Sequence, residues 1–254
     1  MINQESLSKF ESISLEEMGK VKLMNRVDSK YVTYIGKIHE LLQLAIPYYK
    51  VQEINGELNM PYYTCYYDTP EQDMFYQHQR GKKTRQKIRC RKYEGSDTPP
   101  FLEIKSKNNK GRTKKKRVEM LDGMQLTDYN EFLETHTPYP PAGLIPKLEN
   151  HFYRITLVNH EMTERITIDT GLEFHNFETD VRLSLPEIGI IEWKRDGRAE
   201  HSHLKEILRN LRIFEGGFSK YAIGMAFTNP ELKQNRLKKR LRNINKIISK
   251  EKNQ

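Results

Sequence analysis

The segment 85–91 reads RQKIRCR, and this alternation of cations with less polar residues is the clearest structural signal in the chain. Successive side chains of a β-strand point to opposite faces, so every second residue lies on the same surface. The segment is therefore predicted to be a strand with one cationic face and one less polar face. All four residues on the cationic face are Lys or Arg: Arg85, Lys87, Arg89 and Arg91.

The same division of faces recurs in other predicted strands. In each of them, charged side chains share one face and mostly apolar side chains share the other, so we expect helices to cover the apolar faces. Arg154 adds a cation to its own strand. The other charged sets are Arg26, Asp28 and Lys30 in 26–30; Glu103, Lys105 and Lys107 in 101–107; Lys115, Arg117 and Glu119 in 115–120; Arg165 and Asp169 in 164–170; and Glu192 and Lys194 in 191–194.

The charged face has two possible environments. One is open water, as on a half-exposed antiparallel sheet. The other is the interior of a sheet that closes on itself, where unpaired charges cost several kcal/mol each unless water or a polyanion neutralises them. Carboxylates among the cations favour the second, because a metal–polyphosphate ligand needs carboxylates for the metal and Lys or Arg for the phosphates.

The order of the predicted elements indicates an α+β fold. We expect a closed antiparallel eight-stranded β-barrel with helices packed outside it, in one domain over 1–229, followed by a basic helical tail over 230–254 without an apolar partner. Strands are predicted at 26–34, 49–54, 60–69, 84–93, 101–107, 114–121, 150–159, 164–170, 180–184 and 188–195, and helices at 5–20, 36–46, 125–135, 200–211 and 219–227.

The composition excludes several classes of protein. The 254 residues are 30% charged and 36% hydrophobic, with no apolar run near the roughly 18 residues that a membrane span needs. Two cysteines cannot form a disulfide framework, which indicates a reducing cytoplasm. Of the net charge of +9, residues 80–117 carry +13 and 231–254 carry +7, so the remainder is acidic. Two basic segments in an acidic protein indicate a polyanionic partner, or otherwise a solvated charged face.

The ordered motifs of the chain resemble the catalytic domain of the vacuolar transporter chaperone (VTC) family of polyphosphate polymerases. That family lies within the CYTH-like triphosphate tunnel metalloenzymes. The resemblance covers roughly residues 22–227, nearly all of the chain except the basic tail. The motifs that carry it are RVDSKY at 26–31, YYDT at 66–69, IRCRKY at 88–93, FLEIK at 101–105, KKR at 115–117, YR at 153–154, RITIDT at 165–170, IEWK at 191–194 and FSKY at 218–221.

The resemblance implies a metal-dependent polyphosphate polymerase. Such an enzyme transfers the γ-phosphoryl group of ATP to a growing polyphosphate chain inside a tunnel, with Mn²⁺ or Mg²⁺ as cofactor. It further implies that Lys220 and Glu192 are catalytic and that Glu192 holds the metal. The implied substrate- and phosphate-binding residues are Lys30, Arg89, Arg91, Lys105, Lys115, Arg117, Tyr153, Arg154, Arg165, Lys194 and Ser219.

Some features differ from the better-known members of the family. We expect neither a phosphate-sensing domain before the motifs nor a membrane-spanning segment after them. We therefore expect a cytoplasmic enzyme, or one peripheral to the inner membrane, that passes its product to a separate membrane protein. We expect no specific nucleic-acid partner. Two alternatives remain open from the sequence: a tunnel triphosphatase that hydrolyses tripolyphosphate or a nucleoside triphosphate, and a non-catalytic polyphosphate-binding module.

Overall fold

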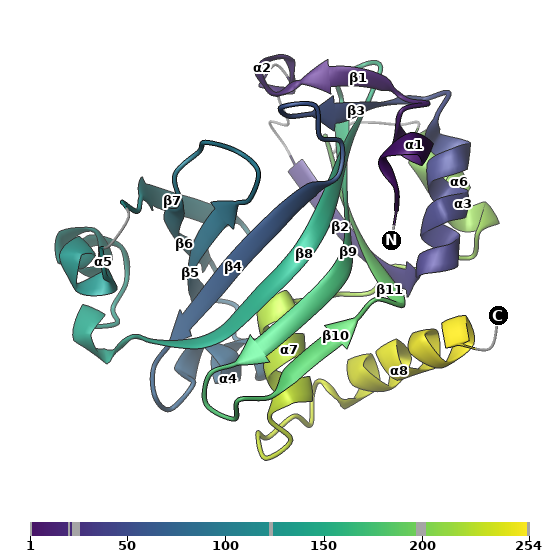
Figure 1. The fold of residues 1–254 in the computed structure, drawn as a ribbon. Coiled ribbons are helices and arrows are strands. Elements are labelled where there is room, and N and C mark those ends of the chain that lie inside the picture. The colour runs from purple at the N-terminus through teal and green to yellow at the C-terminus, as the bar shows by residue number, and fades with distance from the viewer. Residues whose placement is uncertain (1, 20, 22–25, 122–123, 197–201, 253–254) are drawn as a thin grey trace.

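The structure is a computed structural model, which describes residues 2–19, 21, 26–121, 124–196 and 202–252. Its main feature is a twisted sheet of eleven strands (Figure 1). Eight of them form one continuous antiparallel path, with each strand paired to the next. In spatial order these are β2 (Arg26–Tyr34), β11 (Ile188–Asp196), β9 (Glu164–Asn176), β8 (Ile145–Asn159), β4 (Met60–Asp68), β5 (Arg85–Tyr93), β6 (Phe101–Lys107) and β7 (Thr113–Glu119).

The expected closed eight-stranded barrel is wrong, because the two ends of this path do not pair with each other. The outer edge of β2 is taken by a later segment: Tyr31 forms a bridge with Glu215, and the Gly216 amide donates to the Lys30 carbonyl at 2.8 Å. At the other end, six of the seven residues of β7 are exposed, and four are Lys or Arg. Charged side chains on an edge strand oppose pairing with another strand.

Three further strands extend the sheet beyond the eight. β1 (Glu11–Ser14) pairs in parallel with β3 (Tyr49–Glu53), β3 pairs with β8, and β10 (Arg182–Leu185) pairs with β9. The single helix predicted over 5–20 is therefore wrong. Two short helices, α1 (Gln4–Leu7) and α2 (Leu15–Met18), flank β1 instead. Pairing with β3 gives this segment backbone partners that its local sequence does not reveal.

Two apolar clusters cover the outer faces of the strands, as the alternation predicted. Ile166, Ile168, Ile191 and Trp193 pack beneath α3 (Ile35–Ala45) and α6 (His203–Asn210). The outer face of β5 and β6 is covered by η1 (Leu126–Tyr129), α5 (Asn130–His136) and the segment around η2 (Pro141–Gly143). There the buried residues are Ile88, Leu102, Ile104, Leu126, Leu133 and Leu144.

The third cluster joins the sheet to α7 (Lys220–Thr228), with α4 (Asp73–Gln79) and α8 (Lys238–Lys252) beside it (Figure 1). Ala222 and Met225 of α7 are buried in it, together with Phe152 of β8 and Phe174 of β9. Gly224 permits this close packing, because a Cβ there would lie 2.6 Å from side-chain atoms of both Leu148 and Phe174. This packing fixes the position of the first residue of α7, Lys220.

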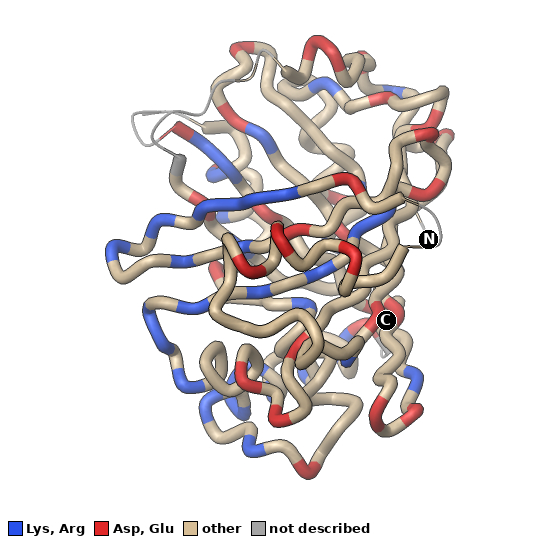
Figure 2. The backbone as a smooth tube through the Cα atoms, turned by 90° about the vertical axis from the view of Figure 1, so that its left-hand side faces the viewer, with Lys and Arg blue, Asp and Glu red and all other residues tan. Residues whose placement is uncertain are grey.

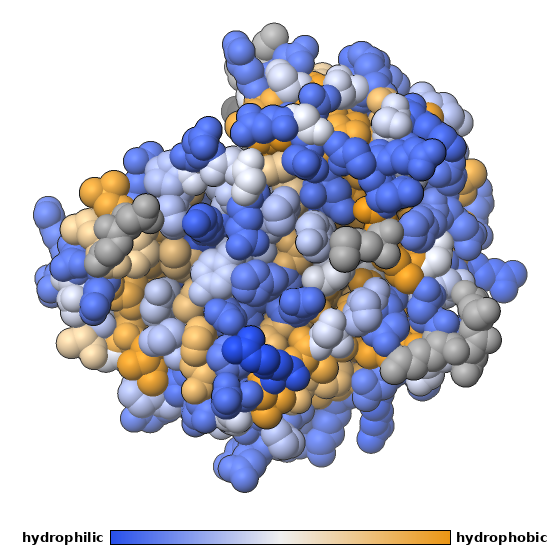
Figure 3. Space-filling model, in the orientation of Figure 1, coloured by the Kyte–Doolittle hydropathy of each residue, from blue (hydrophilic) through white to orange (hydrophobic). Residues whose placement is uncertain are grey.

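The basic tail forms α8, but the expectation that it lacks an apolar partner is wrong. Leu237 and Ile244 are buried in the third cluster, and Leu241, Ile247 and Ile248 pack against its edge. The cations of the helix between Lys238 and Lys250 are exposed, so α8 is an amphipathic helix fixed to the domain. The visible face of the molecule is largely hydrophilic (Figure 3). None of the helices in the described residues has the length and apolar content that a membrane crossing requires.

Candidate functional site

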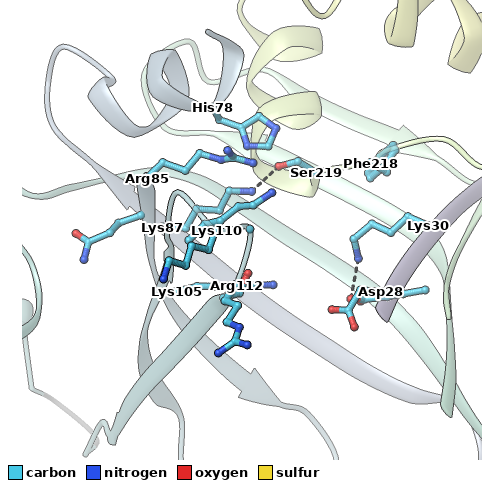
Figure 4. Close-up of a pocket in the computed structure, with 15 residues that line it drawn as sticks. Asp28, Lys30, His78, Arg85, Lys87, Lys105, Lys110, Arg112, Phe218 and Ser219 are labelled. Atoms are coloured by element: carbon cyan, nitrogen blue, oxygen red, sulfur yellow. Dashed lines mark hydrogen bonds and ion pairs between the residues drawn. The ribbon is translucent and has the colours of Figure 1, made fainter. Parts of the chain in front are cut away.

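A groove with a cavity of about 930 Å³ lies between the two ends of the strand path. One wall is formed by β5, β6 and the β6–β7 hairpin, and the other by β2 and β11, while Phe218 and Ser219 line it next to α7 (Figure 4). Figure 2 shows Lys and Arg concentrated along the strands of the first wall. Besides His78 and two carboxylates, Asp28 and Glu192, seven cations line the cavity: Lys30, Arg85, Lys87, Lys105, Lys107, Lys110 and Arg112.

The first wall contains a buried carboxylate between two cations. Glu103 of β6 has a fully buried side chain, and its Oε2 accepts from Arg89 Nε at 2.8 Å and Arg89 Nη2 at 2.6 Å. Lys115 Nζ of β7 donates to Oε1 at 2.9 Å. Burial alone would raise the pKa of Glu103, but these cations lower it to about 2. Glu103 therefore stays ionised and holds both cations on the inner face.

A second carboxylate, Asp169 of β9, lies where α7 meets the sheet. Arg154 of β8 binds it with two hydrogen bonds, Nε to Oδ1 at 2.6 Å and Nη2 to Oδ2 at 2.8 Å. Lys220 Nζ also donates to Oδ2 and lies 4.0 Å from the ring centroid of Phe152. Burial opposes ionisation of Asp169, but Arg154 and Lys220 more than offset it and hold its pKa below the usual range. Two strands and a helix thus converge on one anion.

A third carboxylate, Glu192 of β11, faces the cavity itself. Its Oε1 lies 2.8 Å from Lys30 Nζ, and its Oε2 lies 3.5 Å from Lys194 Nζ. Asp28 is placed opposite Lys194 by the pairing of β2 with β11. Burial disfavours the charged form of Glu192, but Lys194 and Lys30 hold its pKa well below the usual value. This wall therefore presents an ionised carboxylate between two ammonium groups.

Other cations of the site have no carboxylate partner within the described residues. Lys87 Nζ donates to Ser219 Oγ at 2.7 Å, which links the first wall to the start of α7 (Figure 4). Arg91 donates from Nε to Thr64 Oγ1 at 3.2 Å. Burial and neighbouring cations lower the pKa of Lys87 well below its usual value and also lower that of Arg91. The site thus holds an excess of positive charge that an anionic ligand would stabilise.

The structure divides the residues expected to bind substrate into three groups. Lys30, Lys105, Glu192 and Ser219 line the cavity directly. Arg89, Arg91, Arg154, Lys115, Lys194 and Lys220 belong to the ionic clusters beside it, and Arg165 lies opposite Lys194 in the pairing of β9 with β11.

Two expected residues lie outside these groups. Arg117 is exposed on β7, opposite Glu103 in the pairing with β6, and stacks on the ring of Phe101 at 4.5 Å. Tyr153 lines a second cavity of about 510 Å³, which also contains Glu149, His151 and Glu173. Adjacent residues of a strand point to opposite faces, so Tyr153 faces away from the side on which Arg154 binds Asp169.

Several lining residues received no role from sequence. Arg85 and Lys87 were placed on the cationic face by alternation, but the family motif begins at Ile88 and assigned them nothing. Lys107, which alternation also placed on the charged face, is opposite Arg85 in the register of β5 with β6, but no family motif includes it. His78, Lys110 and Arg112 come from helix α4 and the β6–β7 turn, where no strand alternation operates.

Anion binding by this site is expected to weaken as the pH rises from about 7 to about 9. Burial lowers the pKa of Lys220 to about 7 and the pKa values of Lys105 and Lys194 to about 8. These lysines lose positive charge over that interval, and a bound anion favours their protonated forms. Titration calorimetry of tripolyphosphate at pH 8, in two buffers of different ionisation enthalpy, should therefore show net proton uptake on binding.

The same lowered pKa values determine whether the free energy of unfolding rises or falls with pH. The folded-state pKa values lie below the unfolded lysine value, so the unfolded chain holds more protons between about pH 7 and 10.5. The lysines therefore disfavour folding below this interval, and their contribution to the free energy of unfolding of the ligand-free protein rises with pH across it. An affinity that is constant from pH 7 to 9, with no proton uptake, would contradict this description of the site.

Comparison with known proteins places these features in a family. The family model of the VTC domain matches residues 25–229. A search of curated protein sequences found no significant match. Similar solved structures include a candidate adenylate cyclase from Bacillus halodurans (14% identity, 77% of this chain and 96% of that chain, TM-score 0.45). They also include a Pyrococcus horikoshii protein (16% identity, 79% and 98%, TM-score 0.45).

A further similar structure is a candidate adenylyl cyclase from Hippeastrum, reported to have a dominant triphosphatase activity. It is 14% identical, the match covers 80% of this chain and 96% of that chain, and the TM-score is 0.48. The family model spans most of the chain and every strand from β2 to β11. The protein therefore belongs to the VTC domain family.

Proposed function

We propose that the protein is a polyphosphate polymerase that transfers the γ-phosphoryl group of ATP to a growing chain of inorganic polyphosphate in the groove. The observation that carries this proposal is the convergence of Glu103, Asp169 and Glu192, each held between two cations, on a groove with further cations. Membership of the VTC family adds support. Such a dense set of charges suits phosphoryl transfer, which depends on positioning and on charge neutralisation.

The residues fit a divalent metal only if the substrate supplies part of its coordination. No three His, Cys, Asp or Glu side chains of the described segments are grouped closely enough to hold a metal by themselves. Mg²⁺ is commonly bound by one or two carboxylates together with waters and substrate phosphates. Glu192 would hold the metal, with Asp28 on the neighbouring strand as the second carboxylate. When bound, a divalent cation would neutralise phosphate charge.

The protein's own residues would bind and orient the reacting groups. Lys30 and Lys105, from opposite walls, would contact the phosphate oxygens of ATP, and Lys87 would exchange Ser219 for a phosphate oxygen. A terminal oxygen of the polyphosphate chain attacks the γ-phosphorus, the bond to the β-phosphate oxygen breaks, and ADP leaves with the electron pair. Lys220 would stabilise the charge on the transferred group. No covalent intermediate with the protein is needed.

The direct test is to incubate the purified protein with ATP and Mn²⁺ and to analyse the products by gel electrophoresis. The proposal predicts long, acid-labile phosphate chains and an equal release of ADP. Free phosphate as the only phosphate product would instead identify a triphosphatase, in which water is the acceptor. Tight binding of polyphosphate without turnover would identify a non-catalytic binding module. Either of these outcomes would overturn the polymerase proposal.

Replacing Glu192 by Gln is expected to reduce turnover at least about 100-fold, which is the scale for loss of one preorganised charge in an active site. The substitution conserves size and removes the negative charge that Lys30 and Lys194 now contact. Steady-state ATP consumption measures the effect, and circular dichroism checks the fold. Glu173→Gln, at an exposed position of β9 outside the groove, is the control. Unchanged turnover in Glu192→Gln would remove Glu192 from the proposed metal site.

A further inference from the structure

The cationic surface continues beyond the groove onto the beginning of α8. The guanidinium of Arg240 lies over Gly217, with its Nη2 3.3 Å from the position that a Cβ would occupy there. Gly217 immediately precedes Phe218 and Ser219, which line the groove. One turn earlier, Arg236 Nη1 donates to the carbonyl of Arg80, at the end of α4. Two cations of the tail are therefore located at the mouth of the groove.

The mouth brings cations together from three parts of the chain. Arg85 begins β5, Lys107 ends β6, and Arg240 belongs to the first turn of α8. Burial, together with Lys87 and these three cations, lowers the pKa of His78, on α4, to about 2. Burial lowers the pKa of Arg85, and the positive charge of Arg240 lowers it further. The charges are thus close enough to repel one another.

The mouth differs from the interior in having no compensating carboxylate. Within the described segments, no ion pair joins Arg85, Lys107, Arg236 or Arg240 to an acidic side chain, whereas Glu103, Asp169 and Glu192 each bind two cations inside. Clustered like charges destabilise the folded protein and attract anions from solution. The uncompensated cluster is therefore suited to an anion that is bound only some of the time.

The apolar face of α8 holds these cations in place. Leu237 and Ile244 are buried against the domain, and Leu241 packs between them at the same edge. Arg236, in the turn just before α8, and Arg240, in its first turn, are both exposed and four residues apart. The surface offers spaced cations, which suit a repeating anion. Among the described residues that line the groove, Phe218 and His78 alone carry rings, whereas binding of single-stranded nucleic acid commonly uses several stacked aromatic side chains.

We propose that Arg236 and Arg240, with Arg85 and Lys107 at the mouth, form an external track that binds the part of a linear polyphosphate chain extending out of the groove. The proposal rests on the function proposed above only in the identity of the anion. The track predicts that the protein binds a phosphate chain longer than a triphosphate more tightly than a triphosphate. A triphosphate is held by the groove residues alone, whereas a longer chain contacts the track as well and gains affinity from it.

The test is the double charge reversal Arg236→Glu/Arg240→Glu, with affinity measured for long-chain polyphosphate and for tripolyphosphate. Reversal of both charges is expected to weaken long-chain binding by about tenfold and to reduce the salt dependence of its affinity, since fewer counterions are released. Binding of tripolyphosphate is expected to change less than about twofold, because screening limits the effect of charges beyond the contact site. Circular dichroism and thermal melting verify that the variant is folded.

The matched control is Lys246→Glu/Lys250→Glu, which makes the same change in net charge at the other end of α8. Lys246 and Lys250 are exposed and four residues apart, like the track residues. The control is expected to retain wild-type affinity for both ligands. An equal loss in the control, an equal loss of tripolyphosphate binding in the track variant, or no loss for the long chain would each overturn the track.

Two further outcomes separate this inference from the proposed function. If the wild-type protein makes no polyphosphate but the track variant selectively loses long-chain binding, the polymerase proposal fails and the track stands. If the protein is a polymerase and long-chain affinity is unchanged in the variant, the track fails and the polymerase stands. A single-stranded oligonucleotide that binds as tightly as polyphosphate at equal ionic strength, with the same loss in the variant, would contradict the assignment of polyphosphate.

Discussion

Replacing Asp169 by Asn is expected to destabilise the ligand-free protein by about 3–5 kcal/mol, which corresponds to a fall of roughly 10 °C in Tm for a chain of this size. Asp169 has a side chain only 5% exposed and binds both Arg154 and Lys220. Removing its charge leaves two buried cations without their anion. The size of the side chain is conserved, so the loss reports on charge and hydrogen bonding rather than on a cavity.

The same variant is expected to respond more strongly to anions than the wild-type protein. A bound phosphate can partly replace the negative charge of the missing carboxylate. Saturating tripolyphosphate should therefore raise the Tm of Asp169→Asn by more than it raises the Tm of the wild type. Thermal melting with and without the ligand measures both effects.

Asp180→Asn is the matched control for this experiment. Asp180 binds His175 at 2.7 Å, but its side chain is 89% exposed, and such surface pairs contribute at most about 1 kcal/mol. Equal stability of the Asp169 and Asp180 variants would contradict the proposed charge balance at the start of α7. A loss of stability in Asp169→Asn that tripolyphosphate does not reduce would contradict the proximity of the bound phosphates.

Replacing Lys220 by Met is expected to lower kcat for ATP by about 10²–10³-fold, the range seen when one preorganised donor to a transition state is removed. Lys220 is the first residue of α7, beside Asp169 and above the ring of Phe152, where burial removes the water that would otherwise screen its charge. Met retains the length of the side chain and its packing. Affinity for tripolyphosphate should fall much less than kcat, because cations on both walls remain.

A second variant distinguishes a cationic role from a proton-transfer role. Lys220→Arg retains a positive charge at all accessible pH values, whereas burial lowers the pKa of Lys220 to about 7. If Lys220 acts as a cation, Lys220→Arg should keep more activity than Lys220→Met. Its activity should also persist to a higher pH than that of the wild type. Turnover by Lys220→Met within a few-fold of wild type would exclude Lys220 from the reaction.

Alternation within strands was enough to predict which strand residues share the charged face. Arg89, Glu103 and Glu192 were placed on the charged face by their position in the strand alone. The residues adjacent to them in the sequence, Ile88, Ile104 and Trp193, are buried in the apolar clusters on the opposite face. This inference succeeds because the period of two is a property of the strand itself. It requires no knowledge of which strand lies beside which.

Closure of the sheet was not predictable in the same way. It depends on whether the edges of β2 and β7 meet, and the bridge between Tyr31 and Glu215 involves residues that are 184 positions apart. The packing of α8 was missed for a related reason: Leu237 and Ile244 bury against residues distant in sequence, and the abundance of Lys and Arg obscured their spacing. Long-range pairing, rather than local pattern, decides each of these features.

The central claim is that cations and carboxylates of opposite walls bind one chain of phosphates between them. The most direct measurement is a crystal structure of the protein with Mn²⁺ and a non-hydrolysable ATP analogue. We predict that the triphosphate lies in the groove between Lys105 of β6 and Glu192 of β11, with Lys30 and Lys87 within hydrogen-bonding distance of phosphate oxygens. Phosphates bound elsewhere, with Glu192 still paired only to Lys30 and Lys194, would contradict the claim.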